Sequence, residues 1–212
     1  MSKFLGPIHH WLFHKIHLYE DLEKKLIQAY KEKYGNLIEK ISQQAQGKYG
    51  PFLETKPLDE LINVNNIHGW LQHQISIVET RQAEFLQKVF EQYGKDNIDT
   101  ALSIYKKQGL ECGQSAKNNH NIEDAPSIYK ALNDYILNGM PCDHVNHIVI
   151  NKPEKLQWTS TTCLHKPYWE IAGADIHTFY KLRDAWIKAF VENANESYTY
   201  TVDGQNYTIL KK

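Results

Sequence analysis

Two long stretches with apolar residues at helical spacing constrain the fold of this chain most. The first runs from about Pro7 to Tyr34, and proline suits its first position because the missing N–H would be unbonded there anyway. The second begins near Leu58 or Ile67 and reaches Gly94, which is placed to cap it. It is long enough to be the central spine of a bundle. Its predicted core stripe is Ile67, Leu71, Ile75, Val78, Phe85, Leu86, Val89 and Tyr93.

Shorter helices are predicted between and after these stretches, with Asp96, Asp124 and Asp175 as N-caps. The helix after Asp96 carries small residues, including Gly109 and Gly113, on its core arc. Glycine is costly in a helix interior, so either another backbone packs closely there or a ligand lies in a groove. Close packing is the commoner reason. The ligand hypothesis makes Tyr105, Gly109 and Gly113 binding residues.

Two β-hairpins are predicted in the last third of the chain. Residues 145–164 are rich in β-branched and aromatic residues on either side of a turn at Pro153. Near the C-terminus, the Asp-Gly pair at 203–204 favours a type I′ turn, which would place Tyr200 opposite Tyr207. The expected fold class is therefore α+β, a mainly helical N-terminal portion packed with two antiparallel β-hairpins.

Length and composition favour one domain over residues 1–212, with N-terminal helices in 1–56, central helices in 57–140 and a hairpin-helix-hairpin part in 141–212. Lys+Arg 24 against Asp+Glu 25 gives no charge excess that would direct the chain to nucleic acid or an anionic membrane. Charged residues and histidines interrupt the N-terminus before a signal peptide or membrane span could form. Three cysteines fit a reducing compartment. A cytoplasmic protein is predicted, and the abundance of Lys, Asn, Ile and Tyr is typical of a low-GC bacterial source.

The stretch from Cys142 to His165 carries the most suggestive set of metal-ligating side chains. A symmetric turn would pair Cys142 with His165 and His144 with Cys163. All four side chains would then lie on one face, because side chains alternate along a strand. Thiolate and imidazole are suitable donors for zinc or iron. The sequence thus predicts a metal site, with ordinary packing as the alternative, and a β-bulge would scatter the set.

Cys163 and Arg183 are candidates for small-molecule chemistry without a metal. Cys163 could be the nucleophile of a hydrolase, with His144 as its base. Arg183 interrupts the apolar arc of the helix after Asp175. A guanidinium there needs a carboxylate partner or an anionic ligand, since an unpaired buried charge is very costly. Arg183 is therefore the best candidate for binding a carboxylate; the other interpretations are a structural ion pair and an aliphatic stem whose charged head reaches water.

Three histidines in the first long helix have the spacing of a ligand set. His10, His14 and His17 follow i, i+4 and i+7, so one helix could present imidazoles to a metal or a tetrapyrrole. They lie opposite the predicted core stripe. A solvated polar face is therefore the competing interpretation.

The second half of the chain shows a recognisable order of elements. A helix with Gly109 and Gly113 precedes a further helix, strands leading to Cys163, a helix and a terminal hairpin. This order resembles the small-molecule-binding domains of the vinyl-reductase type and the related L-2-amino-thiazoline-4-carboxylic acid hydrolase-like proteins. Tyr207-Thr208-Ile209 stand where that family has a cysteine near the final strand, so Cys163 and the two glycines are the residues that carry over. The resemblance implies binding of a small molecule.

We therefore expect a small-ligand-binding protein, with or without a bound metal. The ligand pocket is expected between the small-residue helix and the Cys142–His165 hairpin. The alternatives are a thiol-dependent small-molecule hydrolase that uses Cys163 and an interaction module without a pocket. The sequence leaves self-association into a homo-oligomer open.

Overall fold

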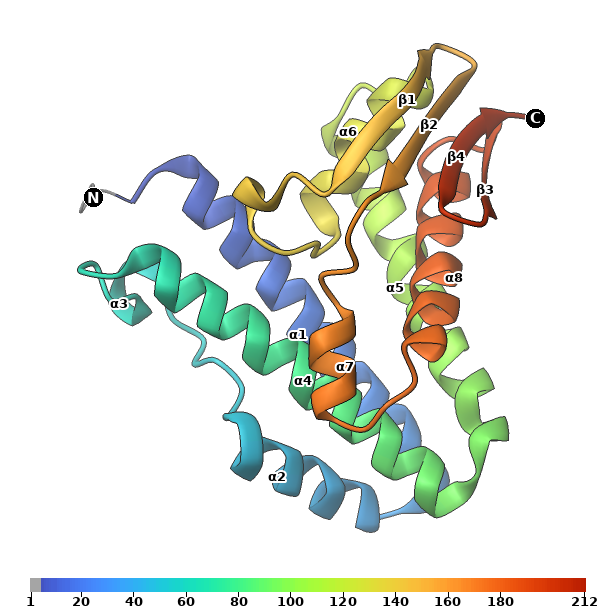
Figure 1. Ribbon diagram of the computed structural model, residues 1–212. Helices are drawn as coiled ribbons and strands as arrows, with labels where there is room; N and C mark the ends of the chain where they lie inside the picture. Colours follow the sequence, from blue (N-terminus) through green and yellow to red (C-terminus); the bar gives the residue numbers. More distant parts are fainter. Residues whose placement is uncertain (1–4) are drawn as a thin grey trace. The chain divides into compact units, whose positions relative to one another are not determined.

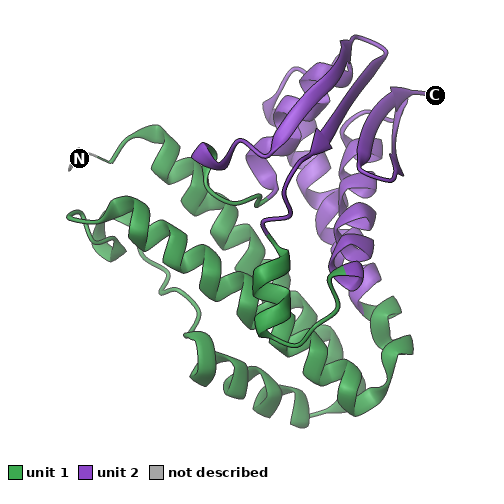
Figure 2. Ribbon diagram, viewed as in Figure 1, with its two compact units in different colours: residues 1–100, 137–141, 165–176 green, residues 101–136, 142–164, 177–212 purple. Residues whose placement is uncertain are grey.

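The structure is a computed structural model that describes residues 5–212. The chain divides into two compact units (Figure 2). Residues 1–100, 137–141 and 165–176 form unit 1, and residues 101–136, 142–164 and 177–212 form unit 2. Both units therefore combine segments that are far apart in the sequence. The organisation as one domain stays a prediction.

Unit 1 is built from helices (Figure 1). The two predicted long helices are α1 (Pro7–Tyr34) and α4 (Ile67–Tyr93), separated by α2 (Leu37–Tyr49) and the short α3 (Leu58–Leu61). A further short helix, α7 (Lys166–Ile171), was not predicted; it packs against α4, as α1 and α2 do. The apolar core combines side chains from α1, α3 and α4 with two from the segment 137–141: Leu12, Phe13, Ile16, Tyr19, Leu58, Ile62, Ile67, Leu71, Ile75, Val78, Leu137 and Met140.

The middle of α4 is buried around its whole circumference. Every residue from Val78 to Leu86 is buried, although the stretch contains Glu79, Arg81 and Glu84. Such a helix is the predicted spine, but its polar side chains are largely shielded from water. Each charged group therefore needs a partner inside unit 1.

Unit 2 contains an antiparallel sheet and helices, so the α+β class is confirmed. Its helices are most of α5 (Ile98–Asn119), α6 (Ala125–Tyr135) and nearly all of α8 (Ile176–Ala194). Asp124 caps α6 as predicted, because its carboxylate accepts a hydrogen bond from the Ser127 backbone N–H at 2.8 Å. Asp96 instead lies in the 3₁₀ turn η1 (Lys95–Asn97), and α5 begins after it.

The two predicted hairpins join into one four-stranded sheet. Strands β1 (Asn146–Lys152) and β2 (Lys155–Ser160) form the first hairpin, and β3 (Tyr198–Asp203) and β4 (Asn206–Lys211) form the second. The strand order is β1-β2-β4-β3, so β2 pairs with β4. The backbone N–H and C=O groups on the facing edges of β2 and β4 are thereby hydrogen-bonded.

The register of the first hairpin follows the prediction only near its turn. Lys152 pairs with Lys155 and Ile150 with Gln157, as a symmetric turn requires. A bulge between Ile148 and Ile150 then shifts the register by one residue, so that Ile148 faces Trp158. The predicted pairing beyond this point is wrong, because one extra residue moves later side chains to the other face.

The predicted register of the C-terminal hairpin is also wrong, by two residues. Tyr200 pairs with Ile209, and Tyr207 pairs with Val202. The turn is centred on Gly204 and the residue after it, and Gly204 has a φ of 57°. Glycine with positive φ at the first central position is typical of a type II′ turn, which here replaces the expected type I′ turn.

The small residues of α5 are explained by close packing on α8. A Cβ added at Gly109 would lie 2.4 Å from the Trp186 carbonyl oxygen, and one at Gly113 would lie 2.5 Å from that of Phe190. Two hydrogen bonds join the same helices: Trp186 Nε1 donates to Gln108 at 3.0 Å, and Asn193 donates to the Leu110 carbonyl at 2.7 Å. The backbone of α8 therefore occupies the surface that a ligand would need at these glycines.

Gly109→Ala should destabilise the protein by about 1–3 kcal/mol, because its Cβ meets backbone atoms that cannot yield like a flexible side chain. Gly47→Ala is the matched control, since Gly47 is exposed in α2 with nothing within 4 Å of an added Cβ. It should be stabilising by up to about 1 kcal/mol through helix propensity. Urea unfolding of the three proteins measures both changes. Equal effects of the two substitutions would contradict this account of the packing.

Candidate functional site

The four residues of the predicted metal set lie in different surroundings. Cys142 is exposed in the 3₁₀ turn η2 (Pro141–Asp143), and His144 is exposed with a positive φ of 46°. Cys163 is half-buried beyond the end of β2, and His165 is buried in unit 1. The strand ladder ends before all four, so it does not align them. Within residues 5–212, no group of three or more His, Cys, Asp or Glu side chains is placed to hold a metal ion, and zinc or iron binding stays a prediction.

His165 takes part in a buried polar network of unit 1. Its Nδ1 lies 2.7 Å from Glu79 Oε1, and its Nε2 lies 3.2 Å from Asn138 Oδ1. Both ring nitrogens of His165 therefore have a polar partner inside unit 1, and the imidazole supplies a hydrogen-bond partner for the buried Glu79 carboxyl group in the middle of α4.

Cys163 belongs to a second polar network, in unit 2. The Tyr180 hydroxyl donates a hydrogen bond to Cys163 Sγ at 2.9 Å. Tyr180, Arg183 and Asp184 lie on one face of α8, because they are separated by three and four residues. Tyr207 approaches from β4 and interacts electrostatically with Cys163 and Arg183. We refer to Cys163, Tyr180, Arg183 and Tyr207 as the thiol–guanidinium cluster.

Aromatic and acidic side chains border this cluster. Trp158 stacks on Tyr207, its cross-strand partner, with ring centroids 5.5 Å apart and planes inclined by 22°. The Tyr200 hydroxyl donates to Asp184 Oδ1 at 2.8 Å, which engages that carboxyl group. The cluster itself remains accessible, because all four of its residues are only half-buried. A small molecule could therefore reach its polar atoms.

Burial sets the protonation of the tyrosines around the cluster. It is the main cause that raises the pKa of Tyr180 and of Tyr207; the neighbouring Cys163 adds to the first shift and the negative charge of Asp184 to the second. Burial also raises the pKa of Asp184, while the hydrogen bond from Tyr200 opposes that shift. The tyrosines therefore stay protonated at neutral pH and act as hydrogen-bond donors.

The remaining predicted residues are placed as follows. Tyr105 is buried in α5. His10 and His14 are exposed, and His17 is half-buried against Phe13, with ring centroids 4.3 Å apart. This placement fits the solvated polar face rather than a shared ligand set.

A histidine pair at the start of α1 and α4 was not predicted. His9 Nε2 lies 3.4 Å from His68 Nε2, and His9 Nδ1 accepts a hydrogen bond from the Gly6 backbone N–H at 3.0 Å. An Nδ1 that accepts this bond leaves the proton of neutral His9 on Nε2, facing His68. A proton shared between the two rings therefore fits better than a metal ion bound by both Nε2 atoms.

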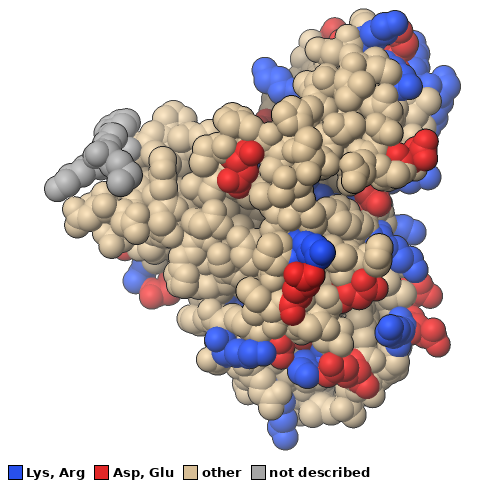
Figure 3. Space-filling view, in the orientation of Figure 1, with Lys and Arg blue, Asp and Glu red and all other residues tan. Residues whose placement is uncertain are grey.

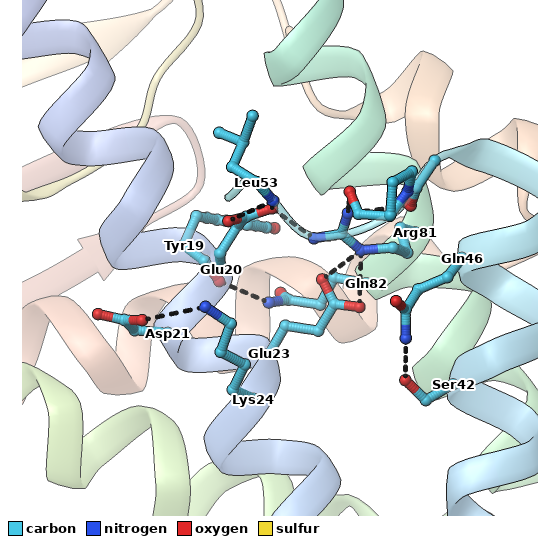
Figure 4. A network of polar contacts seen from close by, with 12 residues as sticks. Tyr19, Glu20, Asp21, Glu23, Lys24, Ser42, Gln46, Leu53, Arg81 and Gln82 are labelled. Atoms are coloured by element: carbon cyan, nitrogen blue, oxygen red, sulfur yellow. Dashed lines mark hydrogen bonds and ion pairs between the residues drawn. The ribbon is translucent and has the colours of Figure 1, made fainter. Parts of the chain in front are cut away.

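The largest polar network of unit 1 was also not predicted (Figure 4). Arg81 is fully buried; its Nε lies 3.0 Å from both oxygens of Glu23, and its Nη2 lies 3.0 Å from Glu20 Oε1. Its Nη1 donates to the carbonyl oxygens of Gly50 at 3.1 Å and Pro51 at 2.9 Å. The sequence signal was the polar interruption of the α4 stripe between Val78 and Phe85, together with acidic residues beside the α1 stripe: Glu20 and Glu23.

Comparisons with family models, curated proteins and solved structures give no match to this chain. The resemblance to vinyl-reductase-type and L-2-amino-thiazoline-4-carboxylic acid hydrolase-like domains therefore stays a prediction.

On the face shown in Figure 3, Lys and Arg side chains are interspersed with Asp and Glu. In residues 5–212, none of the helices combines the length and apolarity needed to cross a membrane.

The His9–His68 pair should be visible in an NMR titration of the histidine rings. Burial lowers the pKa of His9 below its ordinary value of 6.5, and the neighbouring His68 and His10 add to this shift. His68→Ala should therefore raise the pKa of His9. His73→Ala, an exposed change on the same helix, should leave it unaltered. An unchanged pKa of His9 in His68→Ala would contradict the pairing.

Proposed function

We propose that the chain binds a small carboxylate at the thiol–guanidinium cluster of unit 2. The observation that carries the proposal is that the half-buried Arg183 guanidinium lies close enough to the Tyr180 and Tyr207 hydroxyls for its charge to oppose the rise in pKa that burial causes in both. Arg183 offers a planar set of N–H groups that matches a carboxylate, and the Tyr207 hydroxyl adds a neutral donor, while the Tyr180 hydroxyl donates to Cys163 Sγ. Such a set is complementary to an anion rich in acceptor atoms. This location replaces the expected pocket at Gly109 and Gly113, which α8 fills.

The aromatic neighbours favour a carboxylate that carries an unsaturated or aromatic group. Tyr207 and Tyr180 are both half-buried aromatic residues on which the charge of Arg183 acts, and the buried Trp158 supports the Tyr207 ring by stacking on it. Aromatic rings bind flat apolar groups through offset or edge contacts as well as by burial of surface. We therefore propose benzoate as a better probe than acetate.

Arg183→Gln should weaken benzoate binding roughly tenfold or more, because it removes the cation while keeping a polar side chain. Titration calorimetry measures the binding of benzoate and acetate to each variant. Lys181→Gln is the matched control, since Lys181 is an exposed cation on the same helix. Equal losses in the two variants, or no benzoate binding by the wild-type protein, would refute the proposed site.

A thiol-dependent hydrolase is the second candidate, favoured by the hydrogen bond from Tyr180 to Cys163 Sγ at 2.9 Å. A donor directed at sulfur stabilises the thiolate, which is the nucleophilic form. His144, the predicted base, is exposed and precedes β1. Under this hypothesis a substrate carboxylate would bind Arg183 while the Cys163 sulfur attacks the carbonyl carbon of a neighbouring ester or amide. The C–O or C–N bond breaks, the alcohol or amine leaves with a proton, and water then hydrolyses the thioester to a carboxylic acid and regenerates the thiol.

Iodoacetamide labelling followed by mass spectrometry separates the two candidates. If Cys163 is an activated nucleophile, it should react faster than Cys142, which is more exposed and serves as the internal control. Tyr180→Phe should then slow the reaction at Cys163 and leave that at Cys142 unchanged. Slower labelling of Cys163 than of Cys142 in the wild-type protein would count against the hydrolase. Protection of Cys163 by benzoate would support binding in either case.

A further inference from the structure

The Arg81 network contains an imbalance of charge inside unit 1. Arg81, Glu20 and Glu23 bring two carboxyl groups to one guanidinium, and the exposed fractions of their side chains are 0%, 1% and 0%. Lys24 also acts on Glu23, but its side chain is 48% exposed and lies 3.7 Å from Asp21. A second carboxylate without a full counter-charge is very costly in such a setting. One of the two carboxyl groups is therefore expected to hold a proton.

The hydrogen bonds indicate which carboxyl group can accept that proton. Both oxygens of Glu20 lie within 3.3 Å of the Leu53 backbone N–H, and one of them also accepts from Arg81. Glu23 shares a single N–H, that of Arg81 Nε, between its two oxygens at 3.0 Å. Glu20 thus accepts from two donors, Arg81 Nη2 and the Leu53 N–H, whereas Glu23 accepts from Arg81 Nε alone, so the ionised form of Glu23 has less hydrogen-bond support. Glu23 is thus the better proton acceptor.

The same side chains hold the loop that follows α2. Arg81 donates to the carbonyl oxygens of Gly50 and Pro51, and Glu20 accepts the N–H of Leu53. Between them, the Phe52 ring covers Arg81, with the guanidinium carbon 4.1 Å from the ring centroid. The loop 50–53 therefore closes over the network. A change in the hydrogen bonds of Arg81 to the two glutamates therefore also changes its hydrogen bonds to this loop.

We propose that Glu23 is a proton-binding switch, and that its ionisation loosens the hold of Arg81 and Glu20 on the loop 50–53. The ionised group draws Arg81 more strongly and brings a net negative charge into the network. Water must then enter to solvate that charge, and the loop with Phe52 is the cover that can open. Arg81, Glu20 and Lys24 are the charged groups that act on Glu23.

The sign of the pH dependence follows from the shift of Glu23. Burial raises the pKa of Glu23 from its ordinary 4.5 to about 7, and Glu20 adds to this shift while Arg81 and Lys24 oppose it. The folded protein therefore binds the proton more tightly than the unfolded chain does. This contribution to stability is largest at acidic pH and is lost as the pH rises from 4.5 to about 7.

The decisive comparison is urea unfolding of the wild-type protein and Glu23→Gln from pH 5 to pH 8. Titration of Glu23 alone should raise the wild-type unfolding constant on the order of 50-fold over this range. In Glu23→Gln this part of the pH dependence should be absent, because an amide carries no titratable proton. Glu32→Gln, an exposed change on α1, should behave like the wild-type protein. Identical pH profiles for the wild-type protein and Glu23→Gln would overturn the proposal.

Two measurements on the wild-type protein keep the test valid if Glu23→Gln does not fold. Carbon-13 NMR of the glutamate carboxyl groups should show one that titrates near pH 7; titration of every carboxyl below pH 5.5 would overturn the proposal. Hydrogen exchange at the Leu53 amide, corrected for the intrinsic effect of pH, should accelerate between pH 6 and pH 8. A constant protection of this amide would refute the link between Glu23 and the loop.

Discussion

Unit 1 depends on the way in which the charged residues of α4 find partners on different elements. Glu79 pairs with His165 at the start of α7, Arg81 pairs with acidic residues of α1, and Glu84 lies 3.0 Å from Lys48 of α2. Apolar packing alone would tolerate rotation of such a helix about its axis. The three charged side chains point in different directions, so rotation of α4 would separate them from their partners. An unpaired buried charge is far more costly than an imperfect apolar contact. These charged pairs therefore fix the rotation of α4 about its axis and determine which element packs against each side of it.

Unit 2 is held together in a different manner. Its long helices meet through backbone contact at Gly109 and Gly113, and its sheet is covered by aromatic rings such as Trp158 and Tyr200. Close backbone packing leaves no room for a ligand at these two glycines. The half-buried polar atoms lie instead where α8 meets the end of β2, at Cys163 and Tyr180. The rigid helix contact and the accessible cluster thus share α8, which gives the side chains of the cluster a fixed support.

Local sequence patterns predicted the helices well, because apolar spacing and capping residues act within a few positions: α1 and the cap at Asp124 are examples. The patterns did not predict the bulge in β1 or the pairing of β2 with β4, which depend on residues far apart in the sequence. Arg81 was missed as well, because its acidic partners lie on α1, far away in the sequence, although it is one of only two arginines in the chain. In the candidate site, Cys163 and Arg183 were predicted, but their tyrosine partners come from helix and strand positions that no local motif connects.

The interleaving of the two units affects how the chain can be made. Unit 1 takes residues 165–176 from late in the sequence, after most of unit 2 has been specified. During synthesis, Glu79 is made long before His165, so its hydrogen bond to the His165 ring can form only after the segment 165–176 has been made. Domains that end early in the sequence can fold as they emerge, whereas this one cannot be completed until the segment 165–176 is available. The chain therefore offers no single cut that would yield both units as continuous fragments.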